Sequence, residues 1–158
     1  MTTKLSRTGR LAANPFAGVA PLPQAAYPQA VRQQGAYAVV PNAGGTHLLI
    51  LQNKDGRCYL PGGRLEPGEA PEQALAREIA EECSAQARVL GPVHRSTHLI
   101  LDGQVSLEAS YWWAVLETLP ASSTEHIMQW MTPDQACARL HRPGDVEAVR
   151  RAGLLPES

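Results

Sequence analysis

The feature that most constrains the fold is a single uninterrupted helical segment, residues 72–83, between two groups of strand-like runs. The segment consists largely of good helix formers and has no internal Gly or Pro. Pro71 stands at the first helical position, where a missing backbone N–H costs little. Because the chain orders strands, helix, strands and helices without a repeating strand–helix–strand unit, it predicts an α/β fold with helices flanking a mixed β-sheet.

The first group of strand-like runs is short, apolar and separated by turn residues. Residues 36–40 and 47–51 flank the Asn-Ala-Gly-Gly sequence at 42–45, and this pattern predicts a hairpin. The Asp-Gly pair at 55–56 predicts another tight turn, because Gly accepts a positive φ without a Cβ clash. Residues 57–60 then resume an extended run.

The second group of strand-like runs follows the helical segment. Residues 94–101 and 104–116 are rich in β-branched and aromatic side chains and flank an Asp-Gly turn, so they predict a second hairpin. The intervening residues 61–68, before the helix, are dense in Pro and Gly and predict a loop.

The two ends of the chain differ in their sequence patterns. Residues 132–135 (Thr-Pro-Asp-Gln) combine a capping hydroxyl, Pro at the first helical position and a capping-box Gln, so a short helix begins there. A last helix is expected over residues 145–152, ending at Gly153. Residues 1–30 show no periodicity and predict an extension, which leaves residues 31–158 as the domain.

Composition excludes several classes of function. A chain of 158 residues fits one domain, and a net charge of −1, from 14 basic and 15 acidic residues, disfavours a polymeric nucleic acid as partner. No run of apolar residues is long enough for a membrane span or a signal core, so we expect a cytoplasmic protein. Cys58, Cys83 and Cys137 are odd in number and far apart, which indicates reduced thiols.

The helical segment has an acidic face beside an apolar one. At about 100° per residue, Glu78, Glu81 and Glu82 fall within one sector. The apolar side chains fall in the neighbouring sector: Leu75, Ala76, Ile79 and Cys83. Like charges at these spacings repel by a few tenths of a kcal/mol per pair. Such a face is usually solvated, but a divalent cation would make the same cluster favourable.

The loop before the helix favours a metal site. Gly62 and Gly63 let a bare backbone approach the acidic face, where a carbonyl oxygen can serve as a further ligand. Arg77 can reach a carboxylate with two hydrogen bonds, and Glu69 is a candidate partner that would tie the loop to the helix. The alternative for Arg77 is an exposed pair with Glu81 at i, i+4.

This segment resembles the Nudix box: Gly, five residues, Glu, seven residues, then Arg-Glu-aliphatic-any-Glu-Glu-any-Gly-aliphatic. The corresponding residues here are Gly63, Glu69, Arg77, Glu78, Ile79, Glu81, Glu82, Ser84 and Ala85. Six demanded identities at about 6% each would arise by chance on the order of once in 10⁵ such sequences. The resemblance implies a Nudix-like α/β/α sandwich around a mixed β-sheet. It departs at Ser84, where the family has Gly, and this puts the helix end in doubt rather than the chemistry.

The resemblance also implies roles for individual residues. Glu78 and Glu82 would be the main ligands of Mg²⁺, or of Mn²⁺ in its place, with Glu81 assisting and the Gly62 carbonyl contributing. Glu69 and Arg77 would form a structural brace. A carboxylate of Glu82, Glu81 or Glu125 would take the proton of the attacking water. For Glu125, an ordinary acidic residue in a surface loop is an equally good interpretation.

The implied activity is Mg²⁺-dependent hydrolysis of the diphosphate linkage of a nucleoside diphosphate derivative, either a nucleoside triphosphate or a nucleoside diphosphate joined to another moiety. The family's markers for ADP-ribose and dinucleoside polyphosphates are not evident near Leu101, which favours a small nucleoside di- or triphosphate derivative. Two alternatives stay open: a non-catalytic Nudix-like nucleotide-binding module, and an isoprenoid diphosphate isomerase on the same fold. A homodimer is also left open.

The sequence does not identify the residues that bind the substrate. Aromatic side chains could stack on a base, but for each one packing in the core is the more common role. These residues are Tyr59, Tyr111, Trp112, Trp113 and Trp130. Because adjacent residues of a strand point to opposite faces, Trp112 and Trp113 cannot both face one ligand.

Overall fold

The computed structural model of the chain describes residues 30–123 and 125–153, so nearly all of the expected extension at residues 1–30 lies outside the described part. The strands are β1 Val31–Val39, β2 Leu48–Gln52, β3 Cys58–Tyr59, β4 Gly62–Arg64, β5 Ala87–Ile100, β6 Val105–Leu116 and β7 Ile127–Met131. The helices are α1 Pro71–Cys83, α2 Pro133–Arg139 and α3 Pro143–Ala152.

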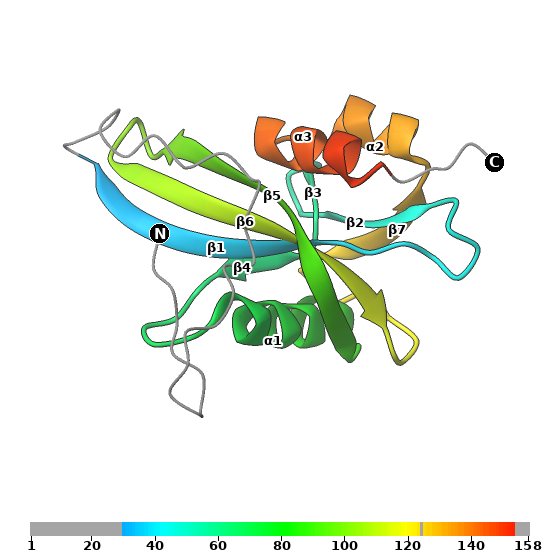
Figure 1. Ribbon diagram of the computed structural model, residues 1–158. Helices are drawn as coiled ribbons and strands as arrows, with labels where there is room; N and C mark the ends of the chain where they lie inside the picture. The colour runs from blue at the N-terminus through cyan, green and yellow to red at the C-terminus, as the bar shows by residue number, and fades with distance from the viewer. Residues whose placement is uncertain (1–29, 124, 154–158) are drawn as a thin grey trace.

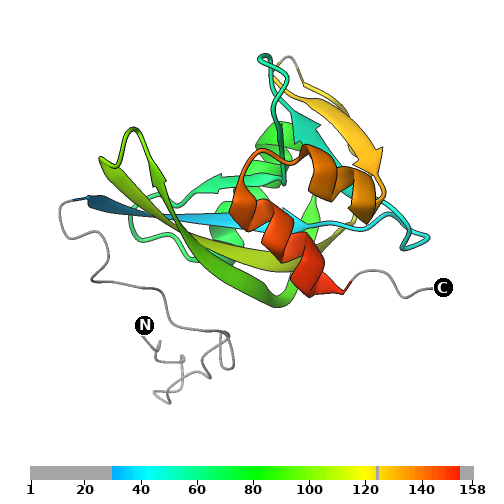
Figure 2. The same cartoon turned by 90° about the horizontal axis from the view of Figure 1, so that it is seen from above.

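The strands form two sheets. One sheet has the order β4-β1-β6-β5 and is mixed, because β1 and β6 run parallel while the other two pairs are antiparallel. The other sheet, β3-β2-β7, is antiparallel. Helix α1 covers one side of this strand layer, and α2 and α3 cover the other (Figures 1 and 2). The expected helix–sheet–helix sandwich is therefore confirmed.

The predicted hairpin of residues 36–40 and 47–51 is wrong in its pairing. The chain reverses as expected, and Pro41 and Leu48 form an isolated antiparallel bridge. Beyond that bridge the strands separate into different sheets, since β1 pairs with β4 and β6 while β2 pairs with β3 and β7. Both neighbours of β1 are thus taken by strands from later in the chain.

Two further differences concern strands. The predicted loop at residues 61–68 contains the three-residue strand β4, which pairs antiparallel with β1. Strand β7 was not predicted, and it pairs along its length with β2. Both strands are too short to show a periodicity of their own, so their partners determine them.

The helix boundaries follow the sequence signals closely. Helix α2 begins with the predicted capping box, in which Thr132 and Gln135 exchange side-chain and backbone hydrogen bonds. Helix α3 starts two residues before the expected position and ends at Gly153, which has a φ of 59°. The predicted β5–β6 hairpin is also present.

The core consists of two clusters on opposite faces of the strand layer. Tyr111 belongs to the cluster under α2 and α3, and Trp112 to the cluster under α1. Trp113 packs against the first cluster, so the two tryptophans point to opposite faces as predicted. All three cysteines are free thiols.

None of the helices in the described residues is long and apolar enough to cross a membrane.

Candidate active site

The acidic face of α1 lies against the backbone of β4. The N–H of Gly62 donates to Oε1 of Glu82 over 2.9 Å, and Gly62 pairs with Tyr37 of β1. Gly62 has a φ of 139°, and a Cβ there would collide with the Ala36 carbonyl oxygen. Only glycine therefore allows the chain to pass between β1 and the Glu82 carboxylate.

Gly63 provides the same close approach for Glu78. A Cβ at Gly63 would lie 2.5 Å from the carboxyl carbon of Glu78 and within 2.7 Å of both its oxygens. Real Cβ atoms do not come so close, so any side chain here would displace Glu78. The Gly62-Gly63 pair thus sets two carboxylates, one helical turn apart, directly against bare backbone.

Arg77 joins the loop to the helix. Its Nε and Nη2 atoms each donate to Glu69 over 2.9 Å, which is the bidentate arrangement. Nη1 donates to Glu78 over 2.9 Å and to Glu81 over 3.5 Å. The two readings of the sequence, a Glu69 partner and an i, i+4 contact with Glu81, therefore coexist, and the contact with Glu69 is the closer one.

The carboxylates differ in their environment. The hydrogen bond from Arg77 holds the pKa of Glu69 at about 2. Burial raises the pKa of Glu82 to about 8, against the opposing effect of the Gly62 N–H. Burial also raises the pKa of Glu78, while Arg77 lowers it. The side chain of Glu81 is 59% exposed. Glu78 and Glu82 are therefore the carboxylates whose charge is least well compensated by the protein.

These donors fit a divalent cation. In the described residues no three His, Cys, Asp or Glu side chains are already grouped as a metal cage; Glu78 accepts from Arg77, and Glu82 accepts from the Gly62 N–H. The donor set nevertheless consists of hard oxygen atoms, and both carboxylates are partly desolvated. A cation between them would relieve the penalty that burial imposes on their charged forms.

Two other residues noted in the sequence lie as follows. Glu125 forms an ion pair with Lys54 at 3.5 Å, and its side chain is 60% exposed. Its backbone N–H donates to the Ser123 hydroxyl over 3.2 Å. Ser84 adopts the left-handed conformation, with φ 53° and ψ 37°, at the end of α1.

The sequence analysis missed a polar group on the other side of the strand layer. Arg142 pairs with Asp145, which is fully buried, at 3.1 and 3.2 Å. Asp145 also accepts from the Leu60 N–H at 3.0 Å and from the Tyr111 hydroxyl at 2.8 Å. The only local signal was a charged pair three residues apart across a helix start, which is common on surfaces.

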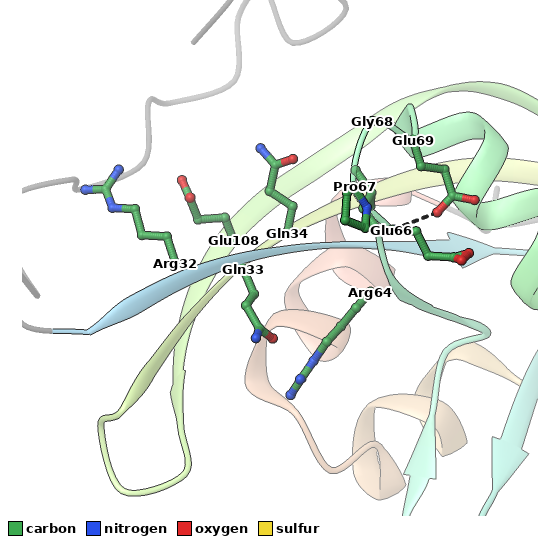
Figure 3. Close-up of a pocket in the computed structure, with 10 residues that line it drawn as sticks. Arg32, Gln33, Gln34, Arg64, Glu66, Pro67, Gly68, Glu69 and Glu108 are labelled. Atoms are coloured by element: carbon green, nitrogen blue, oxygen red, sulfur yellow. Dashed lines mark hydrogen bonds between the residues drawn. The ribbon is translucent and has the colours of Figure 1, made fainter.

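A hollow of about 520 Å³ lies beside the box loop. It is lined by the first half of β1, by residues 64–69 and by Glu108 of β6. Gln33 and Arg64 project to one side of β1, and Arg32 and Gln34 project to the other (Figure 3). Arg64 lies opposite Gly35 in the β1–β4 register, two residues from Tyr37. Burial raises the pKa of Tyr37, against the opposing charges of Arg142 and, to a smaller extent, of Arg64.

Comparison with known proteins agrees with this geometry. Residues 31–152 match the family model of the NUDIX domain. A MutT-like protein of Streptomyces ambofaciens is 30% identical over 141 residues, which cover 84% of this chain and 83% of the relative. A Bacillus subtilis (strain 168) protein, named for 8-oxo-dGTP diphosphatase activity, is 44% identical over 55 residues. That shorter match covers 34% of this chain and 36% of the relative.

Solved structures show the same fold. The solution structure of the E. coli ORF135 protein aligns with a TM-score of 0.68 at 19% identity, covering 82% of this chain and 96% of that one. Together with the family match, this shows that the chain belongs to the Nudix family. It is a Nudix hydrolase of the pyrophosphatase type.

Proposed function

We propose that this Nudix hydrolase cleaves the diphosphate linkage of a small nucleoside di- or triphosphate derivative, with Mg²⁺ as its cation and Mn²⁺ as a substitute. The observation that carries this proposal is the pair of partly buried carboxylates, Glu78 and Glu82, held against the bare backbone of Gly62 and Gly63. The name of the Bacillus relative, which specifies 8-oxo-dGTP, supports a nucleoside triphosphate as substrate.

Different residues of the site have different proposed roles. Glu78, Glu82 and the Gly62 carbonyl would hold the cation, with Glu81 assisting at the exposed edge. When bound, Mg²⁺ neutralises the diphosphate oxygens and acidifies the attacking water. Arg77, fixed by Glu69, keeps the loop in place and orients Glu78. The protein therefore supplies a preformed set of carboxylates, and the cation that they would hold would offset their repulsion of the negatively charged diphosphate.

A carboxylate must also take the proton of the water. Glu81 is exposed and makes only a 3.5 Å contact with Arg77, which supports it as the base. Glu82 is the alternative within the same helix turn. Glu125 has the weakest support, because its carboxylate pairs with Lys54 instead. In the reaction the water oxygen forms a bond to phosphorus while the anhydride P–O bond breaks, and a triphosphate would yield a nucleoside monophosphate and pyrophosphate.

The test is a screen of the full chain with MgCl₂ and, in parallel, with EDTA. The substrates are nucleoside triphosphates including 8-oxo-dGTP, nucleotide sugars, dinucleoside polyphosphates and isopentenyl diphosphate, and the products are separated by chromatography. We expect Mg²⁺-dependent release of two phosphate-bearing fragments from a nucleotide. Binding without turnover would instead identify a binding module, and rearrangement of isopentenyl diphosphate would identify an isomerase.

A further inference from the structure

The chain passes from β3 to β4 through Leu60, Pro61 and Gly62, and this passage has two backbone N–H groups, because proline has none. Both of them donate to carboxylates. The N–H of Leu60 donates to Oδ2 of Asp145 over 3.0 Å, and that of Gly62 donates to Oε1 of Glu82 over 2.9 Å. Asp145 belongs to α3 and Glu82 to α1, so the passage is held from opposite sides of the strand layer (Figure 1).

Gly62 needs support from its neighbours to keep its conformation. Its φ of 139° lies in a region that favours glycine, and a backbone without a Cβ has the widest choice of conformations. The direction of its N–H and C=O groups is therefore set by contacts on either side. The carbonyl of Pro61 accepts from the Ala38 N–H over 2.8 Å, which ties the passage to β1. The preceding donor is the Leu60 N–H, and its acceptor is Asp145.

The Asp145 carboxylate is itself held firmly in place. Oδ1 accepts from the Tyr111 hydroxyl over 2.8 Å and from Nε of Arg142 over 3.1 Å. Oδ2 accepts from Nη2 of Arg142 over 3.2 Å and from the Leu60 N–H. An ionised carboxylate has about four acceptor positions, so these donors use its capacity. They come from β6, from the N-cap of α3 and from the passage into β4, and together they fix the carboxylate in three directions.

Solvent cannot replace the contact between Leu60 and Asp145. Leu60 is 1% exposed and Asp145 is 0% exposed. If the acceptor were lost, the buried N–H would stay unpaired unless the backbone moved. A buried ion pair contributes little net stability compared with apolar residues of similar size, but it can specify one arrangement of the chain. The arrangement specified here includes the backbone that leads into Gly62.

We propose that Asp145 is a positioning residue of the candidate metal site. By accepting from the Leu60 N–H, it fixes the backbone from which the Gly62 carbonyl faces the cation and the Gly62 N–H meets Glu82. This assignment rests on the proposed function. Magnesium requires near-ideal ligand geometry, so a small displacement of one oxygen ligand weakens its binding. Asp145 acts on the site through the backbone, without touching the cation.

The test measures binding of Mn²⁺ alone to the full chain, without substrate, by electron paramagnetic resonance of the free ion. Asp145→Asn keeps the size of the side chain but leaves a single acceptor oxygen for all the donors. We expect the Kd for Mn²⁺ to rise by about 10- to 100-fold, as for other residues that orient metal ligands. Val149→Ala is the matched control, because Val149 is buried on α3 and has no polar side-chain atom. At a temperature where both variants are folded, its Kd should equal that of the wild type.

Amide hydrogen exchange of the metal-free protein, followed by NMR, separates positioning from a general loss of stability. In Asp145→Asn the amides of Leu60 and Gly62 should exchange faster relative to that of Leu49, a fully buried residue of β2 that reports on global opening. In Val149→Ala the three amides should accelerate together. Equal acceleration of the three amides in Asp145→Asn, or an unchanged Kd for Mn²⁺, would overturn the assignment.

If Asp145→Asn fails to fold because Arg142 is left as an unpaired cation, the donor is removed instead. Incorporation of the α-hydroxy acid analogue of leucine gives a chain with an ester in place of the peptide bond between Tyr59 and Leu60. This chain lacks the Leu60 N–H and keeps the pair of Asp145 with Arg142. Its Kd for Mn²⁺ should rise in the same way, and a wild-type Kd would contradict the positioning role.

These outcomes are distinguishable from failure of the proposed function. Turnover of a nucleotide, with Mn²⁺ binding that depends on Glu82 but not on Asp145, leaves the function standing and removes the positioning role. Absence of turnover on every substrate of the screen, with Mn²⁺ binding that weakens in Asp145→Asn, removes the function and leaves the positioning role standing.

Discussion

Two arginine–carboxylate pairs lie on opposite sides of the strand layer and differ in the elements that surround them. Arg77 and Glu69 lie at the surface of the box, with side chains 28% and 15% exposed. Arg142 and Asp145 lie inside, with side chains 19% and 0% exposed. The first pair ties a loop to a helix close by in sequence. The second depends on tyrosines and a backbone N–H from three strands or their ends.

The difference shows how burial changes what an ion pair does. The Arg77–Glu69 pair is only partly buried, and Arg77 keeps Glu78 and Glu81 as further partners, so this pair can be lost with less effect on stability and still matter for positioning. A buried pair costs much to break, because the remaining charge has no solvent to stabilise it. The Arg77 side therefore holds the box loop against helix α1, whereas the Arg142 side is part of the core, and the free energy of unfolding depends on it.

The largest expected effect concerns turnover at the acidic face. Glu82→Gln keeps the size and helix propensity of the side chain but removes the charge that a divalent cation needs. We expect kcat to fall by about 100-fold or more, with an unchanged circular dichroism spectrum. Glu72→Gln, an exposed residue in the first turn of the same helix, is the control and should leave kcat unaltered. Equal losses in both variants would remove Glu82 from the metal site.

The second prediction breaks each ion pair in turn. Asp145→Asn leaves Arg142 as a buried cation without its counter-ion, and we expect a loss of about 3 to 5 kcal/mol in the free energy of unfolding. Glu69→Gln should shift the urea midpoint much less, because Arg77 is partly exposed and keeps Glu78 and Glu81 as partners. Urea denaturation of both variants at pH 7.5 provides the comparison. If the two midpoints fall equally, burial is not what separates the pairs.

The third prediction concerns pH in the absence of divalent cations. The pKa of Glu82 is raised by burial to about 8 in the fold, above its ordinary value of 4.5. The folded state then binds the proton more tightly than the unfolded state, so this stabilisation is present below about pH 4.5 and is lost as pH rises through 8. We expect wild-type protein in EDTA to lose about 1 to 3 kcal/mol between pH 5.5 and 8.5.

Two comparisons isolate the contribution of Glu82 to this pH dependence. Glu82→Gln has no titrating group at the position, so its stability should change less between pH 5.5 and 8.5 than that of the wild type. Added Mg²⁺ should recover wild-type stability at pH 8.5, because it binds the ionised carboxylate. Parallel pH profiles for wild type and Glu82→Gln would show that other groups cause the slope.

The sequence predicted the two sides of the molecule unequally. Helix α1, its acidic face and the nearness of Glu69 to Arg77 depend on residues a few turns apart, and such local relations can be inferred from spacing. The partners of β1 could not be inferred in this way. Pro41 and Leu48 form the first bridge of a hairpin, but beyond it β1 pairs with β4 and β6, which come later in the chain. Arg142 shows the same limit, since its surroundings come from strands distant in the sequence.

The smallest effect is expected at Ser84, which ends α1 in the left-handed conformation with φ 53°. A Cβ in this region is strained relative to glycine, and Ser84 stands where the Nudix box has Gly. Its N–H still donates to the Ala80 carbonyl at 3.1 Å, so the cap itself is formed and only the strain remains to be removed. Ser84→Gly should therefore raise the free energy of unfolding by some tenths of a kcal/mol and leave kcat unchanged. Ser84→Ala is the control, because it keeps the Cβ and loses only the hydroxyl. A midpoint for Ser84→Gly no higher than that of Ser84→Ala would mean that the strain at the end of α1 is already relieved elsewhere.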